Sequence, residues 1–306
     1  MKRLLNIRSR WRSLRAGASE VLSMNQRNLH FIYPSNERRH FPLADNKLLT
    51  KQLLSDAGVP VPHTHKAYSY FFELMEMEDD LKPLQDFVVK PAQGRGGGGI
   101  IVIKGRQGGD WLAAGGSRYS LEALRKHISD IVFGVHSFGL GDQAIIESRL
   151  VQHAAIEAIS PYGLADVRVI AYRNRPVMAM MRVPTAASDG KANLHQGALG
   201  IGIDLDTGHS RHAIFEGGHV SIHPDTGADL LGLPMPDWTE LLCICERAAA
   251  AVPLKYLGID LALTVSGPVV LEINVRPGIE IQNANMLGLR SMLLACEAGQ
   301  ERERVG

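Results

Sequence analysis

The sequence predicts an α+β protein with two lobes. At 306 residues the chain is long enough to bury more than one hydrophobic core. Strand-like and helix-like stretches interleave along it without the regular βαβ alternation of a doubly wound sheet. Two polar clusters of different chemistry lie far apart in the chain: a lysine followed by a glycine-rich loop, and a pair of strands that carry carboxylates. These observations favour two α+β lobes over one parallel sheet.

Composition argues against several classes of protein. The formal net charge is +1, so no overall basic character points to nucleic acid. Three cysteines are too few for a disulfide framework, and we expect them to be core thiols in a reducing, cytoplasmic compartment. No apolar run approaches the roughly 18 residues that a membrane-spanning helix needs. Arg8, Arg10 and Arg12 interrupt the apolar stretch that a signal peptide requires.

The first 15 residues have a composition of their own, with six Lys or Arg and no acidic residue. Their apolar side chains recur at helical spacing, at Leu4, Ile7, Trp11 and Leu14. This pattern predicts an amphipathic basic helix within an N-terminal extension over residues 1–44. Such a helix could dock on the protein itself, on a partner or membrane protein, or on an anionic membrane surface, which would make the protein membrane-associated.

Residues 45–147 are predicted to form the first lobe. A helix begins near Asp45, which can cap its N-terminus, and ends at Gly58. Two more helices are expected at Tyr70–Leu81 and Leu121–Ile131. The strands of this lobe are FVVK, IIVI and QAIIESRL.

Residues 148–297 are predicted to form the second lobe. It begins with a hairpin, ADVRVIAYRN and RPVMAMMRVP, that turns at Asn174. A helix over WTELLCICERAAAAV, two strands and a helix at Asn283–Glu297 complete it. Residues 298–306 are expected to be a frayed tail.

The stretch FVVKPAQGRGGGGIIVI, from Phe87 to Ile103, places a lysine ahead of a loop almost without side chains. Glycine lets the backbone adopt positive φ and approach a ligand closely, and successive N–H groups can form a nest for anions. Lys90, just before the loop, adds a point charge suited to phosphate. A flexible hairpin with a surface lysine is the alternative that this stretch alone leaves open.

The stretch GIDLALTVSGPVVLEINV is predicted to form two strands with one apolar and one polar face. Alternation places six residues on the apolar face: Ile259, Leu261, Leu263, Leu271, Ile273 and Val275. The polar face carries Asp260, Glu272 and Asn274. Two carboxylates and an amide oxygen form a hard-oxygen set suited to Mg²⁺, which shares its coordination with phosphate and water. An ordinary solvated strand face is the alternative.

The pairing register decides whether Asp260 lies on that polar face. Directly opposed residues of an antiparallel pair share a face, so Asp260 opposes Glu272 or Asn274 only if the paired residue numbers sum to an even value. A two-residue turn at Ser266–Gly267 would give an odd sum. The metal site therefore predicts a three-residue loop or a β-bulge near Ser266–Pro268.

Taken in order, these motifs resemble the ATP-grasp superfamily over about residues 45–294. FVVKP with its glycine-rich loop is similar to that superfamily's phosphate lysine and lid, and GID…LEINVRPG is similar to its metal-binding strands. DVRV, MMR and NLHQGA resemble the ribosomal-protein glutamate ligases. Asn25 to Asn36 resembles alpha-L-glutamate ligase-like, sugar-transfer-associated ATP-grasp proteins. The resemblance implies an ATP-grasp fold with two lobes clamping the nucleotide, a short N-terminal helical extension and no full pre-grasp domain.

The resemblance also implies roles for individual residues. ATP would be held by Lys47, Lys90, Gln93, Gly94, Arg95, Gly96, Gly97 and Gly98, although Gln93 and Arg95 could instead be solvated. Adenine would lie against Glu147 and Leu150. The metal, Mg²⁺ or Mn²⁺, would be bound by Asp260, Glu272 and Asn274. The γ-phosphate and the reacting carboxylate would be held by Arg168, Arg182 and Asn193, with Arg276 as a further catalytic candidate.

The implied activity is ADP-forming carboxylate–amine ligation through an acyl-phosphate intermediate. The substrates would be an amino acid such as glutamate and a peptide or other acceptor. D-alanine ligases carry an arginine two residues before the metal aspartate, where this chain has Gly258, so a dipeptide ligase is disfavoured. Two alternatives stay open: an ATP-binding regulatory partner protein without turnover, and a phosphotransferase in cell-surface glycan assembly.

Overall fold

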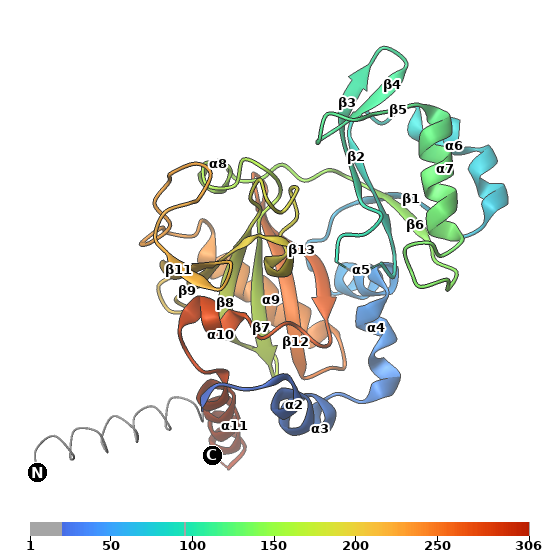
Figure 1. Ribbon diagram of the computed structural model, residues 1–306. Helices are drawn as coiled ribbons and strands as arrows, with labels where there is room; N and C mark the ends of the chain where they lie inside the picture. Colours follow the sequence, from blue (N-terminus) through green and yellow to red (C-terminus); the bar gives the residue numbers. More distant parts are fainter. Residues whose placement is uncertain (1–19, 95, 306) are drawn as a thin grey trace, which may run out of the picture. The chain divides into compact units, whose positions relative to one another are not determined.

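A computed structural model describes residues 20–94 and 96–305, which form two compact units that we consider separately (Figure 1). Unit 2 consists of residues 45–52 and 61–151, and unit 1 of the other described residues. The helix predicted over the first 15 residues and Arg95 lie outside the described residues. The predicted lobe boundaries stay predictions, and the division into units falls within one helix, α5 (Lys47–Asp56).

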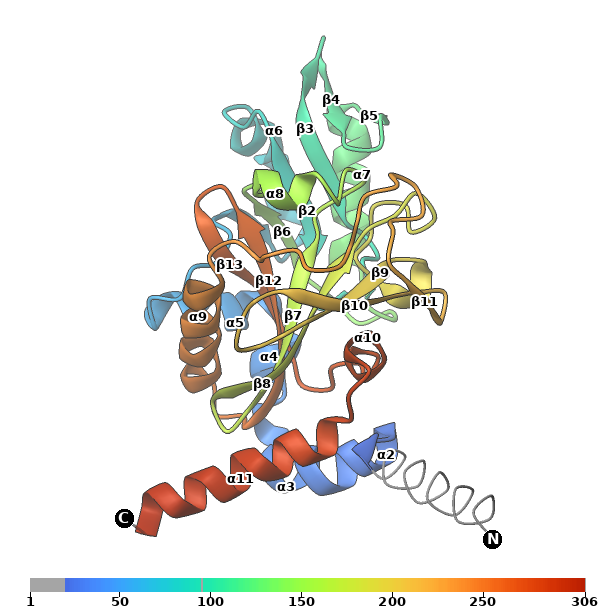
Figure 2. The same ribbon diagram turned by 90° about the vertical axis from the view of Figure 1, so that its left-hand side faces the viewer.

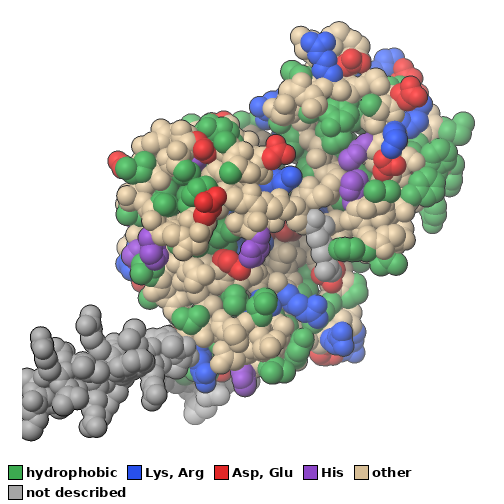
Figure 3. All heavy atoms as spheres, viewed as in Figure 1, with side chains coloured by type: hydrophobic (Ala, Val, Ile, Leu, Met, Phe, Trp, Pro, Cys, Tyr) green, Lys and Arg blue, Asp and Glu red, His purple; other side chains and the backbone are tan. Residues whose placement is uncertain are grey.

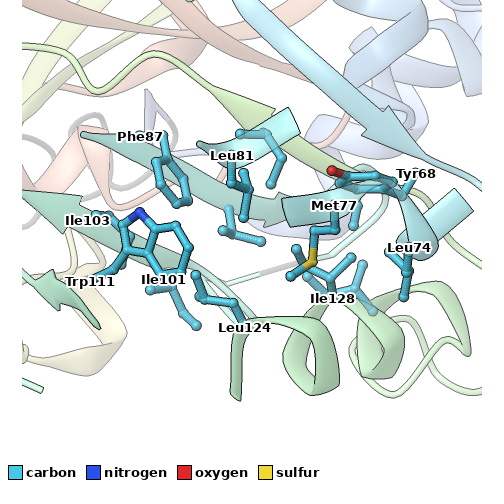
Figure 4. Close-up of a cluster of buried hydrophobic side chains, with 14 of the residues drawn as sticks. Tyr68, Leu74, Met77, Leu81, Phe87, Ile101, Ile103, Trp111, Leu124 and Ile128 are labelled. Atoms are coloured by element: carbon cyan, nitrogen blue, oxygen red, sulfur yellow. The ribbon is translucent and has the colours of Figure 1, made fainter. Parts of the chain in front are cut away.

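Unit 2 contains a six-stranded antiparallel sheet with the order β1-β6-β2-β3-β4-β5. Its strands are β1 (Thr64–Tyr68), β2 (Phe87–Pro91), β3 (Ile101–Gln107), β4 (Asp110–Ala113), β5 (Arg118–Tyr119) and β6 (Ala144–Glu147). The amphipathic helix α7 (Leu121–Val132) packs Leu124 and Ile128 against the sheet, in a buried cluster that includes Phe87 and Trp111 (Figure 4). Burial of this cluster is the main force that holds the unit together.

Two helix predictions in this part of the chain need correction. The side chain of Asn46, not Asp45, caps α5, because its Oδ1 accepts the N–H groups of Leu48 and Leu49 at 2.9 and 3.2 Å. Asp45 instead ends the preceding helix, α4 (Pro42–Asp45).

The single helix predicted at residues 70–81 is in fact two short ones. They are the 3₁₀ helix η3 (Phe71–Met75) and the α-helix α6 (Met77–Leu81). Leu74 of η3 and Met77 of α6 are both buried in the core of the unit.

Unit 1 contains a seven-stranded antiparallel sheet with the order β11-β10-β9-β8-β7-β12-β13. Its strands are β7 (Asp166–Tyr172), β8 (Arg175–Val183), β9 (Leu199–Ile203), β10 (Ser210–Phe215), β11 (Gly218–Val220), β12 (Tyr256–Thr264) and β13 (Gly267–Asn274). The predicted hairpin turn is confirmed: Arg173 and Asn174 both have positive φ, 51° and 68°, as a two-residue type I′ turn requires.

Helices cover both sides of this sheet. Figure 2 shows α9 (Trp238–Ala251) and α10 (Ile281–Asn285) on opposite sides of it. The shorter helices of unit 1 are α2 (Met24–Arg27), the π-helix η1 (Asn28–Ile32), α3 (Tyr33–Ser35), η2 (Arg38–His40), α8 (Ala154–Glu157) and η4 (Leu194–Gln196). Within residues 20–94 and 96–305, no helix is long and apolar enough to cross a membrane.

The helix predicted at residues 283–297 is wrong in its extent. The helix is interrupted after α10, where Met286 adopts φ 51°, and a second helix, α11 (Leu289–Val305), begins three residues later. This helix continues through the residues expected to fray, because ERERV is rich in residues of high helix propensity.

The β12–β13 hairpin contains the expected bulge, but in a different place. Thr264 pairs with Gly267 around a two-residue turn, so the paired residue numbers near the turn sum to an odd value. Asp260 nevertheless opposes Glu272, because Leu271 is an extra, bulged residue in β13. The predicted place of Leu271 on the apolar floor is therefore wrong, and the adjacent Val270, 1% exposed, lies there instead.

Candidate functional site

The glycine-rich loop of unit 2 has the backbone geometry that its sequence predicts. Gly96, Gly97 and Gly99 have φ of 63°, 78° and 76°, in the region that other residues avoid. Gly94 approaches its neighbours so closely that a Cβ there would lie 2.2 Å from Pro91. Lys47 donates a hydrogen bond from Nζ to the carbonyl oxygen of Gly94 at 2.9 Å, so the predicted helix lysine does lie at the loop.

A buried group of three charges lies beside the start of this loop. The carboxylate of Glu147, at the end of β6, is 2.6 Å from Nζ of Lys90 on β2 and 2.7 Å from Nζ of Lys51 on α5. All three side chains are less than 10% exposed. Burial opposes ionisation of Glu147, but the charges of Lys90 and Lys51 outweigh it and hold its pKa below the ordinary value. The group therefore carries two cations against one anion.

Sequence reasoning missed Lys51, although a signal was present. Lys51 follows Lys47 by four residues, which places both on one side of α5. Burial lowers the pKa of Lys51, against the attraction of Glu147, and the charge of Lys90 adds to that lowering. Glu147 was expected at adenine, and its carboxylate is here engaged by the two lysines. Leu150, its expected partner at adenine, is half-buried in the segment that follows β6.

Both ends of the loop are held by the chain that surrounds α7. At the start, the N–H of the exposed Gln93 donates to the buried carboxylate of Asp142 at 3.0 Å, and Ser137 donates its hydroxyl to the same carboxylate. At the end, Nε2 of His127 lies 2.8 Å from the carbonyl oxygen of Gly99. No local pattern in the sequence marks Asp142 and His127, because they are 49 and 28 positions from Gln93 and Gly99.

A second polar cluster lies on the sheet of unit 1, where four charged residues alternate in sign. Arg168 donates two hydrogen bonds to Asp260, at 2.7 and 2.6 Å. Arg182 donates two to Asp166, both at 2.6 Å, and a third to Asp260 at 2.8 Å. Two of these pairs, Arg168 with Asp260 and Asp166 with Arg182, are directly opposed across neighbouring strands. The structure therefore brings the two predicted arginines to the predicted metal strands.

The two acids of this cluster differ in their pKa. Burial opposes the ionisation of Asp260, but Arg168 and Arg182 outweigh it and hold its pKa well below the ordinary value. Burial raises the pKa of Asp166 to about 6, because Arg182 only partly compensates and Asp260 adds repulsion. Burial works against the charge on Arg182 as well, but Asp166 and Asp260 raise its pKa above the ordinary value. Asp166 was missed from the sequence, although it stands two residues before Arg168 and so shares its face.

The residues predicted to bind metal lie together on one face of β12 and β13. Nδ2 of Asn274 donates to Asp260 at 3.1 Å and to Glu272 at 3.2 Å. Their oxygen donors fit Mg²⁺ or Mn²⁺ in kind. The described residues contain no group of three or more His, Cys, Asp or Glu side chains placed to bind a metal, so a cation here would complete its coordination with substrate oxygens and water.

Two predicted catalytic residues lie outside this hydrogen-bonded cluster. Asn193 caps the short helix η4, with its Oδ1 accepting the N–H of His195 at 3.0 Å. Arg276 is exposed, and its guanidinium lies 5.2 Å from the ring centre of Phe41. Their catalytic roles stay predictions.

Comparisons with known proteins agree on one superfamily. Residues 26–298 match the family described as "Sugar-transfer associated ATP-grasp". Probable alpha-L-glutamate ligases from Halorhodospira halophila and Hydrogenovibrio crunogenus are 26% and 27% identical over 266 and 267 residues. These matches cover 86% of this chain but only 66% of either relative.

A solved structure supports the same fold. A biotin carboxylase from Campylobacter jejuni, in a β-γ-ATP complex, has a TM-score of 0.52 and 15% identity. The alignment covers 82% of this chain and 45% of that one. At this identity the likeness shows the fold alone.

Proposed function

Because the chain belongs to the sugar-transfer-associated ATP-grasp family, we propose that it is an ADP-forming carboxylate–amine ligase. The observation that carries the proposal is the placement of Arg168 and Arg182 against Asp260 on the strands that also present Glu272 and Asn274. This arrangement places two guanidinium groups next to a hard-oxygen set. Such a combination suits phosphoryl transfer to a carboxylate.

On the nucleotide side, Lys90 and Lys51 would bind phosphate oxygens, with Glu147 as the counter-ion that keeps two lysines together in a buried position. The N–H groups of Gly96 to Gly98 would form the anion nest, and Lys47 would fix the loop through Gly94. Adenine would lie against the backbone near Leu150, directly after β6.

On the reacting side, the two arginines would neutralise the charge that develops as a carboxylate oxygen attacks the γ-phosphorus. The bond between the γ-phosphorus and the β–γ bridging oxygen breaks, ADP leaves and an acyl phosphate forms. An amine then attacks the acyl carbon, and phosphate departs. Asp166 and Asp260 would hold Arg182 in place between them, so its guanidinium would need little reorganisation during the reaction.

Asp260, Glu272 and Asn274 would hold Mg²⁺ or Mn²⁺. The cation would supply Lewis-acid neutralisation of phosphate oxygens. A cation on Asp260 would compete with the hydrogen bonds that Arg168 and Arg182 donate to its carboxylate, and so would make N–H groups of both arginines available to the substrate. The same two arginines would thus stabilise Asp260 before the substrate binds and the phosphate afterwards.

The choice of substrate rests on the relatives. Their names, probable alpha-L-glutamate ligases, favour an amino acid such as glutamate as the amine or the carboxylate. We propose a peptide or another acceptor as its partner. The words "sugar-transfer associated" in the family description are the reason to keep a second candidate, phosphoryl transfer to a hydroxyl in cell-surface glycan assembly. The products separate the two activities: an amide with ADP, or a stable phosphoester with ADP.

Hydroxylamine trapping tests the proposal. The purified chain, given ATP, Mg²⁺ and amino-acid or peptide carboxylates, should form a hydroxamate and ADP in equal amounts. Arg182→Ala should reduce both by about 10²–10³-fold, since one charge-stabilising donor is lost. Arg211→Ala, which breaks a surface ion pair with Asp204 in the same unit, is the matched control and should leave both unchanged. Formation of AMP and pyrophosphate would contradict the proposal.

A further inference from the structure

An apolar surface that the core does not need covers one side of unit 2. It is formed by eight exposed side chains, which we call the apolar patch: Tyr70, Phe71, Phe72, Met75, Phe133, Val135, Phe138 and Leu140. Met75 and Phe138 are 85% and 89% exposed. Hydrophobic side chains are prominent on the surface of this unit in Figure 3. Contiguous exposed apolar surfaces of this kind usually bind a partner.

Two segments of the chain meet in the patch. One is η3 with the residue before it, and the other is the connection from α7 to β6. The rings of Phe71 and Phe133 have centroids 5.9 Å apart and so join the two segments. Tyr70 and Phe72 stack with centroids 5.7 Å apart. Because Leu74 alone among the apolar residues of η3 turns into the core, the exposed ones are not required for packing.

The border of the patch is acidic. Residues 73–80 contain five Asp or Glu and no Lys or Arg. Lys66 lies 3.1 Å from Asp80 and 3.9 Å from Glu76, so it offsets part of this charge. Glu78 and Asp79 are exposed. An apolar surface with an acidic edge fits an amphipathic segment with basic flanks, and it disfavours an anionic membrane.

The chain itself contains a segment with that chemistry. Its first 15 residues have apolar side chains at helical spacing, six positive charges and no negative ones. We infer that the apolar patch binds residues 1–15 of a second copy of the chain. Each copy offers both the segment and the patch, so a reciprocal exchange would close a two-fold dimer.

Sedimentation velocity of the full chain tests this inference, independently of any enzymatic activity. At low salt the chain should form a dimer in a concentration-dependent manner, and raising the salt should weaken it, because the contact is between opposite charges. The double variant Phe71→Ser with Phe138→Ser should dimerise at least tenfold more weakly. Val265→Ser, at an equally exposed apolar residue in the β12–β13 turn, is the matched control and should dimerise like the parent.

A charge exchange identifies the occupant. Arg8→Glu with Arg12→Glu should weaken the dimer, and adding Glu78→Lys with Asp79→Lys should restore it. A chain that stays monomeric at every concentration would overturn the inference, as would dimerisation that the patch substitutions do not affect. Binding to phosphatidylglycerol vesicles that requires Phe71 and Phe138 in a monomeric chain would instead assign the patch to a membrane and equally overturn it. Circular dichroism verifies that each variant is folded.

Discussion

His127 on α7 contacts the last of four consecutive glycines: its Nε2 atom lies 2.8 Å from the carbonyl oxygen of Gly99. The ring of His136 is packed so closely that a Cβ on Gly99 would come within 2.8 Å of it. The end of the loop is therefore fixed by a hydrogen bond and by a steric contact. The loop is anchored at this end as it is at Gln93 and Gly94.

His127→Ala should weaken the proposed ATP site by releasing the end of the loop. A single hydrogen bond is worth about 1 kcal/mol, so we expect the KM for ATP to rise roughly fivefold. His127→Gln, which keeps an N–H donor, should recover much of the loss. The control is His63→Ala, in the same unit and in ring contact with His65. An unchanged KM in His127→Ala would contradict the anchoring role.

Lys90→Ala should abolish nucleotide binding, measured by calorimetry, because the triphosphate charge would be left unpaired in a buried position. Lys47→Ala should lower affinity less and turnover more, since its side chain is bonded to the loop backbone. Lys104→Ala, at an exposed residue of β3, is the control for a general loss of positive charge. Unchanged affinity in Lys90→Ala would remove the basis of the loop assignment.

Glu147→Gln should destabilise the protein strongly, because it leaves two buried lysines without their counter-ion. Losing one partner of a buried ion pair typically costs about 3–5 kcal/mol. Asp86→Asn is the matched control: its ion pair with Arg149 is partly exposed and should contribute less than about 1 kcal/mol. Urea unfolding measures both, and equal losses in the two variants would mean that burial of the Glu147 group has no special cost.

Asp166 gives the stability a pH dependence of unusual sign. Its folded-state pKa is raised to about 6, so the folded protein binds more protons than the unfolded chain between about pH 4 and pH 6. Stability contributed by this group is therefore present at low pH and is lost as the pH rises through that window. Its slope should be up to about 1.4 kcal/mol per pH unit.

Asp166→Asn should remove this slope. Urea unfolding at pH 4.5 and pH 7 checks it, because the difference between parent and variant isolates Asp166 from histidines that titrate in the same window. Glu147 and Asp260, whose pKa values are lowered, contribute in the opposite sense and only at lower pH. A parent and a variant with parallel pH profiles would refute the raised pKa.

The bulge at Leu271 leads to a prediction about insertions and deletions. Deleting Leu271 leaves Val270 opposite Leu261 and Glu272 opposite Asp260, so the polar face should survive and the protein should still fold. Inserting an alanine after Leu271 also restores regular alternation and leaves Glu272 and Asn274 on the polar face, but it pairs Glu272 with Gly258 in place of Asp260. Every later residue of β13 then shifts by two along β12, so the insertion should cost more stability than the deletion. Thermal unfolding of the two variants compares them, and equal losses would contradict this reading of the register.

Much of the site was predictable, because its signals are local. Asp260, Glu272 and Asn274 were placed on one face by alternation along two strands that a short turn joins. The glycines of the loop were recognisable as a run. Parity of the register required a three-residue loop or a bulge but did not distinguish them or place the bulge, since Leu271 and its neighbour Val270 are equally apolar.

The rest depends on contacts between residues far apart in the sequence. Glu147 is 96 positions from Lys51, and no pattern in the sequence reveals that one carboxylate serves two lysines. Asp142 was missed for the same reason, since it meets Gln93 only after β6 has joined β2. The sequence also could not identify the residue that caps α5, because Asp45 and Asn46 are both favourable N-cap residues.

The alternating row of Asp166, Arg182, Asp260 and Arg168 also has an evolutionary consequence. Replacing one of the two inner members, Arg182 or Asp260, by a neutral residue leaves Asp166 or Arg168 without its partner, so single changes at these two positions pass through a destabilised intermediate. A neighbour could then be replaced at little further cost, because the unmatched charge would go with it. Natural variants should therefore keep these four positions together or change an acid and its arginine as a pair. Substitutions at the exposed ends of the same strands should follow no such rule.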